Sequence, residues 1–274
     1  MKFGITQGRL TDEKKGVLQK FPSKWNQEFE ILEHTNLDYI ELFLENKVNK
    51  KNPIWSKGGQ RKLLENLNKT NINHHIVCDN FILDKPLDSQ DLIKYYKKLF
   101  KNIRAIKCKL LIVPLSDKNF LKKNVPKLLK FLAFLDKESK KKKLKISLEI
   151  DQHFDELKKI LSICKIKDIK ITFDTGNFYL KNKNVLNYLK SYYPFINHIH
   201  LKDRDKKGKN VVFGSGEINF KSLFKFLKKK KYNKSFTFET NRGNIALKTA
   251  INNLNIVKNL IESPSASSTI AYNS

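Results

Sequence analysis

Cysteine, arginine and long apolar runs are scarce in this chain of 274 residues. Its three cysteines are too few and too scattered for a disulfide framework or a thiolate zinc site. No apolar run approaches the roughly 20 residues that a membrane span requires. No apolar stretch behind a charged start marks an export signal either. These absences favour a protein of the reducing cytoplasm that makes no use of a membrane.

The strong positive charge of the chain comes almost entirely from lysine. The formal net charge is +28, yet arginine occurs five times and lysine fifty times. Arginine is the residue whose planar guanidinium pairs with phosphates and base edges, so its scarcity argues against specific recognition of nucleic acid. Lysines spread over helical segments are typical of solvated helix faces. The charge predicts only weak, salt-sensitive binding to polyanions.

A Gly-x-Gly-x-x-Gly turn after the first strand is also missing, which removes the best indication of a dinucleotide-binding fold. Instead, short β-rich runs alternate with apolar positions at helical spacing. The predicted strands are Lys2–Thr6, Asp38–Phe43, Ile72–Cys78, Lys109–Pro114, Lys145–Ile150, Asp168–Asp174, Phe195–Leu201 and Ser235–Thr240. Strands separated by single helices imply right-handed crossovers and a parallel sheet. Eight such units in about 250 residues fit a closed barrel.

The domain prediction is therefore one α/β domain, a (β/α)8 TIM barrel, over residues 1–262. No linker-like stretch divides these residues. The last segment, 263–274, is rich in small and polar residues, and we expect it to be a disordered tail.

Polar residues gather at the ends of the last four predicted strands. They are Glu149, Asp174, His200 and Glu239. In a TIM barrel the strand ends meet at one face, where active sites lie. Three carboxylates buried together require a compensating cation, and three carboxylates with one imidazole suit Mn²⁺, Mg²⁺, Co²⁺ or Zn²⁺. The alternative is that these are unrelated strand-end residues paired with lysines.

The order and spacing of several short motifs add a resemblance to this interpretation. The motifs are Phe3-Gly4-Ile5-Thr6-Gln7-Gly8-Arg9-Leu10, Leu37-Asp38-Tyr39-Ile40-Glu41-Leu42, Ser147-Leu148-Glu149, Phe173-Asp174-Thr175-Gly176-Asn177, His198-Ile199-His200-Leu201-Lys202-Asp203, Gly214-Ser215-Gly216-Glu217-Ile218-Asn219-Phe220 and Phe238-Glu239-Thr240-Asn241-Arg242-Gly243. From Lys2 to Ile261 the chain resembles the sugar isomerase/epimerase superfamily of xylose-isomerase-like TIM barrels. That superfamily includes ketose 3-epimerases, inosose dehydratase and the apurinic endonucleases.

The resemblance implies a function. It places Glu149, Asp174, His200 and Glu239 on the four ligands of one divalent metal ion, and it makes Glu149 and Glu239 the acid–base pair of an epimerase. A positioned base alone contributes about 10² to 10⁴ in rate, and a metal on the substrate oxygens adds several kcal/mol by stabilising enediolate charge. The expected enzyme is a metal-dependent isomerase or epimerase of a sugar, sugar phosphate or related polyol ketone.

Five further residues are candidates for substrate binding: Gln7, Glu41, Asn177, Lys202 and Arg242. Gln7 and Glu41 lie near the ends of the first two strands. Lys202 follows His200 at the spacing that sends strand residues to one side, and Arg242 is one of five arginines, suited to a carboxylate or phosphate. Asn177 stands where some relatives have histidine. Each has a plainer alternative: a solvated lysine, a turn residue or a structural contact.

Three other functions stay open at this stage. An inosose-type dehydratase or lyase would begin with the same proton abstraction. An apurinic endonuclease-like phosphodiesterase would fit the charge, but six histidines and the Asp203-Arg204-Asp205 segment do not supply its histidine-rich zinc cluster. A barrel that binds ligands without metal is the third. The expected partner is a small sugar, with no specific nucleic acid, and homo-oligomerisation is left open.

Overall fold

In the computed structural model, which describes residues 1–12, 20–70, 72, 75–150 and 154–262, eight parallel strands close into a barrel. Around the barrel they run in the order β1-β10-β7-β6-β5-β4-β3-β2. Their bounds are β1 Lys2–Thr6, β2 Tyr39–Leu44, β3 Ile76–Asp79, β4 Leu110–Pro114, β5 Lys145–Glu149, β6 Lys170–Asp174, β7 Ile196–Leu201 and β10 Ser235–Phe238. Lys2 of β1 is in register with Ser235 of β10, which closes the ring. The predicted TIM-barrel fold is confirmed.

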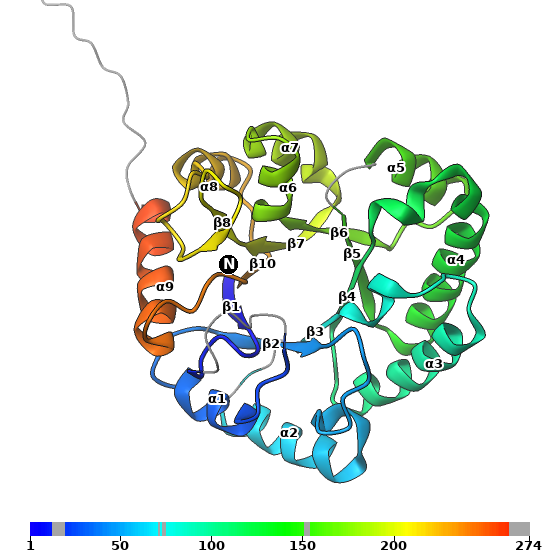
Figure 1. Ribbon diagram of the computed structural model, residues 1–274, viewed down its shortest axis with the longest axis horizontal. Coiled ribbons are helices and arrows are strands. Elements are labelled where there is room, and N and C mark those ends of the chain that lie inside the picture. The colour runs from blue at the N-terminus through cyan, green and yellow to red at the C-terminus, as the bar shows by residue number, and fades with distance from the viewer. Residues whose placement is uncertain (13–19, 71, 73–74, 151–153, 263–274) are drawn as a thin grey trace, which may run out of the picture.

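Helices surround this ring on the outside (Figure 1). Within the described residues they are α1 Trp25–Leu32, α2 Lys57–Lys69, α3 Gln90–Ala105, α4 Val125–Lys142, α5 Phe154–Ile163, α6 Thr175–Lys181, α7 Val185–Tyr192, α8 Phe220–Lys229 and α9 Ala246–Glu262. In α3, Ser89 accepts a hydrogen bond from the Leu92 amide at 3.3 Å and caps the first turn. Leu92, Tyr96 and Leu99 then recur at helical spacing and are buried.

The third strand is shorter than predicted. We expected it to begin at Ile72, but β3 begins at Ile76. The ring of His75 explains the late start, because its two nitrogens lie 2.8 Å from the carbonyl oxygens of Ile72 and Ile106. These contacts join His75, which directly precedes β3, to Ile72 and to Ile106 at the C-terminal end of α3. The predicted tail, 263–274, lies outside the described residues, so its disorder stays a prediction. None of the helices in the described ranges combines the length and hydropathy needed to span a membrane.

A small hairpin that was not predicted follows β7, made of β8 Asp203–Arg204 and β9 Asn210–Val211. The buried Asp203 carboxylate organises the loop beyond it. Its Oδ1 accepts from the amides of Arg204 at 2.9 Å and Ile218 at 3.4 Å, and its Oδ2 from those of Gly214 at 2.9 Å and Gly216 at 2.8 Å. A Cβ at Gly216 would collide with Asp203 and the Arg204 carbonyl. In the Gly214-Ser215-Gly216 motif, position 216 must therefore be glycine.

Asp203→Asn should destabilise the protein by about 2 to 4 kcal/mol. The substitution replaces one carboxylate oxygen with an NH₂ group, which cannot accept the hydrogen bonds of the Gly214 and Gly216 backbone amides. The check is the free energy of unfolding in urea. The matched control is Asp205→Asn in the same hairpin. Asp205 accepts the amides of Lys207 and Lys209 through one oxygen, which asparagine keeps. Equal losses in the two variants would contradict the assigned role of Asp203.

Candidate active site

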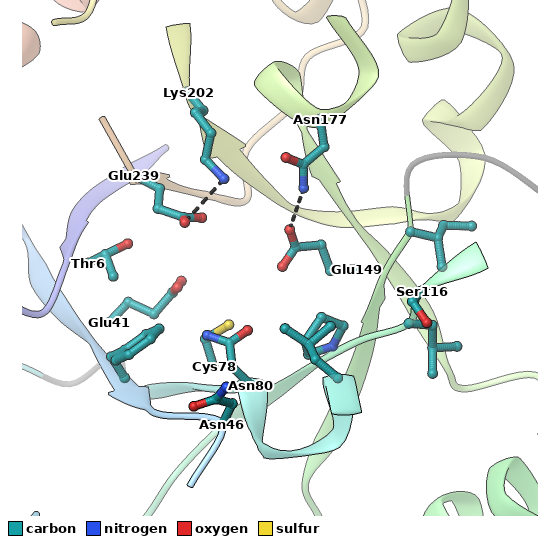
Figure 2. A pocket seen from close by; sticks show the side chains of 15 residues that line it. Thr6, Glu41, Asn46, Cys78, Asn80, Ser116, Glu149, Asn177, Lys202 and Glu239 are labelled. Atoms are coloured by element: carbon teal, nitrogen blue, oxygen red, sulfur yellow. Dashed lines mark hydrogen bonds and ion pairs between the residues drawn. The ribbon is translucent and has the colours of Figure 1, made fainter. Parts of the chain in front are cut away.

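A cleft of about 400 Å³ opens at the C-terminal ends of the strands. Its size is that of a small-molecule site. Figure 2 shows polar side chains from β2, from β5 and from the segments after β7 and β10 pointing into the same space. The described residues that line it are Thr6, Glu41, Phe43, Asn46, Cys78, Asn80, Leu83, Pro114, Leu115, Ser116, Glu149, Ile150, Asn177, Lys202 and Glu239.

The four strand-end residues come together at this cleft: Glu149 and Glu239 line it, and Asp174 and His200 are fully buried next to them. Asp174 ends β6 and is the register partner of His200 in β7. Nδ1 of His200 lies 3.7 Å from Glu149 Oε2, 3.9 Å from Asp174 Oδ2 and 3.2 Å from Glu239 Oε2. One ligand atom from each of the four residues lies within 4.8 Å of all the others. The closed parallel sheet thus brings together side chains up to 90 positions apart in the sequence.

This arrangement fits a divalent metal ion. Two ligands of one ion that each lie about 2.1 Å from it can be no more than about 4.2 Å apart, and all three contacts of His200 Nδ1 satisfy that limit. The set is three carboxylates and one imidazole, almost wholly withdrawn from water: Asp174 and His200 are 0% exposed and Glu239 7%. Such a concentration of negative charge in a buried place calls for a cation.

Lys202 meets part of that demand in the chain itself. Its Nζ lies 2.8 Å from Asp174 Oδ2 and 3.1 Å from Glu239 Oε1. Burial opposes a charged lysine, but Asp174 and Glu239 raise the pKa of Lys202 above its ordinary value. A Cβ at Gly176 would lie 2.7 Å from Cγ of Lys202, so the glycine leaves room for the lysine stem. The ammonium group is therefore fixed at the cleft floor and stays charged.

The two glutamates of the set have different surroundings. Glu149 Oε1 accepts a hydrogen bond from the side-chain amide of Asn177 at 3.0 Å. Glu239 instead contacts Lys202 and His200. Burial raises the pKa of Glu149 well above its ordinary value; His200 opposes this shift, and the carboxylates of Asp174 and Glu239 add to it. Burial acts in the same direction on Glu239, but Lys202 and His200 outweigh it and hold its pKa well below the usual range. One carboxyl therefore has an amide partner and the other has cationic partners.

A second buried cluster supports His200 from behind. The Glu41 carboxylate lies 3.0 Å from Nε2 of both His198 and His200, and it accepts from the Thr237 hydroxyl at 2.8 Å. Burial would raise the pKa of Glu41, but His200 and His198 outweigh it and lower the pKa to about 2. With Nε2 held by Glu41, the other ring nitrogen of His200 faces the three carboxylates. A carboxylate behind a ligating histidine fixes its tautomer and orientation in this way.

The candidate substrate-binding residues divide into two groups. Glu41, Asn177 and Lys202 line the cleft. Gln7 and Arg242 do not appear among the described lining residues. The side-chain oxygen Oε1 of Gln7 accepts from the backbone amide of Phe43 at 3.2 Å, and the Arg242 guanidinium donates to the backbone carbonyl of Gly8 at 3.0 Å. Both side chains, as described, brace the loops around the cleft.

The residues on the opposite wall of the cleft were not predicted from the sequence. This wall comes from the end of β2 and from the segments after β3 and β4, and it supplies Phe43, Asn80, Leu83 and Leu115 among others. Residues at the C-terminal ends of barrel strands form the active-site face, and this applies to these strands as well. The sequence could therefore have indicated these positions. Their types gave no chemical signal, because apolar residues and asparagine are common in loops. The four metal-ligand candidates thus lie on β5, β6, β7 and just after β10, and most of the apolar and amide lining lies across the cleft. Among the described lining residues on that side, Glu41 of β2 is the charged exception.

Asp79, next to this wall, yields a pH-dependent prediction. It is fully buried, accepts from the Tyr95 hydroxyl at 2.8 Å and the Phe81 amide at 3.2 Å, and caps the turn η2 Asn80–Asp84. Burial raises its pKa from 3.8 to about 6 despite these bonds. When the pKa of a carboxyl is higher in the folded protein than in the unfolded one, the group stabilises the fold fully at pH values below its unfolded pKa. That stabilisation is lost as the pH rises through the folded-state pKa.

Between about pH 4 and pH 7, the free energy of unfolding of the wild type should therefore fall by about 2.4 kcal/mol relative to Asp79→Asn. Asparagine can still accept from Tyr95 and Phe81 but does not titrate. Urea unfolding at the two pH values measures this change. A difference between the two proteins that does not vary with pH would contradict it.

Comparison with known proteins assigns the chain to a family. Residues 29–261 match a family model described as xylose isomerase-like TIM barrel. The chain belongs to the xylose isomerase-like TIM-barrel family. The resemblance inferred from the motifs is thereby confirmed, and the matched range contains all four metal-ligand candidates.

Within curated proteins, the chain matches inosose dehydratases over part of their length. It is 34% identical to the enzyme of Yersinia enterocolitica over 102 residues, which are 30% of this chain and 34% of that enzyme. It is 29% identical to the enzyme of Clostridium perfringens over 99 residues. The chain thus covers about a third of the length of these curated relatives, and the match alone does not carry their activity over to it.

Solved structures of the same fold include several sugar epimerases. D-psicose 3-epimerase from Clostridium cellulolyticum H10, determined with D-tagatose, superposes with a TM-score of 0.74 and 14% identity over 96% of this chain and 100% of its own. The 3-keto-D-glucoside 4-epimerase of E. coli superposes with a TM-score of 0.71 and 14% identity, over 94% and 99% of the two chains. At such identities, these likenesses establish the fold.

Proposed function

We propose that this protein is a divalent-metal-dependent isomerase or epimerase of a small polyol ketone or sugar. The observation that carries the proposal is the pair Glu149 and Glu239. Their carboxylates enter the cleft from different strands, point toward the same space in Figure 2, and share the cation site with Asp174 and His200. The solved sugar epimerases of the same fold support the choice of reaction.

The residues have separate tasks in this proposal. Glu149, Asp174, His200 and Glu239 would hold the metal ion, and Glu41 fixes the ring of His200. When bound, the ion would polarise the substrate carbonyl and stabilise negative charge on the substrate oxygens. One glutamate removes the proton from the carbon next to the carbonyl, and the other returns a proton on the opposite side. Lys202 Nζ stabilises oxygen charge nearby, and Asn177 keeps Glu149 in position.

We further propose that the substrate carries no phosphate group. The described lining contains three carboxylates, those of Glu41, Glu149 and Glu239. Its single ammonium, that of Lys202, is already held by Asp174 and Glu239. Even with a divalent ion bound, the carboxylates of Glu41, Glu149, Asp174 and Glu239 outnumber the positive charges of the ion and of Lys202 by four to three, so a phosphate dianion would lie against net charge of its own sign. A neutral polyol ketone avoids that repulsion, and its hydroxyls match the amides of Asn46, Asn80 and Asn177.

A panel of ketoses, keto-inositols and their phosphates, incubated with enzyme and Mn²⁺ in D₂O, tests these proposals. An accepted substrate should gain deuterium at the carbon next to its carbonyl, observed by NMR. Unphosphorylated compounds should be converted at least about tenfold faster than their phosphates, from the charge of the lining. A preference for phosphates would overturn the substrate class, and a lack of exchange with every compound would overturn the reaction.

A dehydratase is the second candidate, and the identity to inosose dehydratases favours it. Removal of the same proton would then be followed by loss of a hydroxyl from the next carbon. The panel separates the two reactions. Dehydration lowers the substrate mass by that of one water, whereas epimerisation or isomerisation leaves the mass unchanged apart from deuterium.

A further inference from the structure

A second hollow, of about 930 Å³, lies at the opposite, N-terminal end of the barrel strands. Its described lining has an unusual charge. It contains the lysines Lys2, Lys109, Lys140, Lys143, Lys145, Lys167, Lys170 and Lys234. A single acidic residue, Asp168, is among the described lining residues, together with uncharged polar groups such as Asn197 and Ser235. We call these eight side chains the lysine ring.

The barrel topology gathers the lysine ring. All strands of a parallel barrel begin at the same end. Lys2, Lys145 and Lys170 are the first residues of β1, β5 and β6, and lysine also directly precedes β4 and β10. Hydrogen bonds hold neighbouring starts together: the amide of Lys2 donates to the Lys234 carbonyl, and that of Lys145 to the Lys109 carbonyl. Charges distant in sequence therefore share one hollow.

Within the described residues, this charge has little compensation. Within the lysine ring, Lys140 forms ion pairs at 2.7 Å with Asp136 and at 3.9 Å with Asp168, whose side chain is 71% exposed. The Lys234 ammonium donates a hydrogen bond to the uncharged Ile196 carbonyl. Burial, followed by the charges of Lys170 and Lys145, lowers the pKa of Lys234. That shift agrees with the geometry, in which ammonium groups from separate strands lie close enough to repel one another.

Two general explanations do not account for the lysine ring. Lysines favour helix C-termini, which also lie at this end of a TIM barrel, and Lys143 at the end of α4 is such a residue. The strand-start lysines Lys2, Lys145 and Lys170 are not at helix ends. The chain is also rich in lysine, but it holds 55 basic and 27 acidic residues, about two to one, whereas the described lining holds eight to one.

We propose that the lysine ring binds a compact polyphosphate anion, a small molecule that bears two or more linked or neighbouring phosphate groups. Several ammonium groups around one hollow match several phosphate charges at once, and lysine binds phosphate as a point charge. A hollow bounded by strand starts suits a compact ligand better than the extended backbone of a duplex. This site is independent of the cleft and of the proposed reaction there.

Isothermal titration of the metal-loaded protein with inorganic tripolyphosphate, in about 150 mM salt to screen surface charge, tests the proposal. We expect one molecule bound per chain. The triple variant Lys145→Gln, Lys170→Gln, Lys234→Gln should bind at least about tenfold more weakly. The matched control is Lys94→Gln, Lys97→Gln, Lys101→Gln on exposed positions of α3, which removes the same charge and should change affinity less than about twofold. Any withdrawal of metal by the probe is the same in all three proteins.

Amide chemical-shift mapping of the wild type with tripolyphosphate keeps the test decisive if the triple variant does not fold. Shifts should gather around Lys145, Lys170 and Lys234 and be small on α3. Three results would overturn the proposal: no saturable binding, equal weakening in the two triple variants, or tighter binding of a short DNA duplex than of tripolyphosphate at the same residues. The last would make the lysine ring a nucleic-acid surface.

Discussion

Glu149→Gln and Glu239→Gln should each lower the turnover of an accepted substrate by about a hundredfold or more, the usual effect of removing a general base or acid. Glutamine keeps an oxygen that can contact a metal ion but does not exchange a proton usefully at neutral pH. Metal content should therefore fall much less than turnover. Steady-state rates, deuterium uptake by NMR and elemental analysis of the same samples measure the two effects together.

The control is Glu45→Gln, the same chemical change just after β2, where the side chain accepts from Asn49 and does not appear among the described lining residues of the cleft. It should leave turnover within about twofold, as is usual for a surface substitution. A nearly active Glu149 or Glu239 variant would indicate a single base. Turnover without deuterium uptake would indicate hydride transfer between carbons. Either result would discard the paired-glutamate proposal and leave the barrel intact.

His200→Ala and Asp174→Ala should abolish most of the metal binding. Changes in the partners behind a metal ligand typically weaken metal affinity by about 10- to 100-fold, so loss of a ligand should cost at least as much. The measurement is divalent metal per chain after dialysis against a fixed free concentration. His34→Ala, an exposed position after α1, serves as the control and should retain the metal. Near-stoichiometric metal in both ligand variants would overturn the assignment.

Glu41→Gln separates support of the ligand from ligation. Glutamine preserves a carbonyl oxygen for the Thr237 hydroxyl and for a ring N–H, but it has no charge to hold His198 and His200. We expect metal affinity to fall by about 10- to 100-fold, with turnover recovered at saturating metal. Turnover that stays low at saturating metal would instead assign Glu41 to substrate, which remains a prediction from the sequence.

The barrel and the ligand set could be predicted because both follow from local patterns with a geometric rule. Asp174 and His200 each close an apolar run, and in a parallel barrel such ends share one face, so their proximity required no long-range information. The same rule did not predict where a side chain beyond a strand end points. Arg242 lies after β10, close to the cleft in sequence, but its guanidinium donates to Gly8. Side-chain direction beyond a strand end depends on the loop backbone.

The rest of the site depends on contacts between segments that have no periodic pattern. The room for Lys202 is left by Gly176, from the turn after another strand. The hairpin β8–β9 depends on four amides meeting one carboxylate at Asp203. Leu83 and Asn80 reach the wall from η2, a 3₁₀ helix that is too short to show a repeating pattern in the sequence. Sequence periodicity carries none of this information.

The separation between the metal-ligand candidates and the apolar wall has a consequence for redesign. The wall, formed by the end of β2 and the segments after β3 and β4, contributes Phe43, Leu83 and Leu115, none of which bonds to Glu149, Asp174, His200 or Glu239 in the described structure. A combinatorial library over these three positions would alter the volume and shape offered to the substrate while leaving the chemical machinery in place. The barrel would therefore be suited to accepting new substrates through changes in this wall, with the proposed catalytic groups on the other side of the cleft left unchanged.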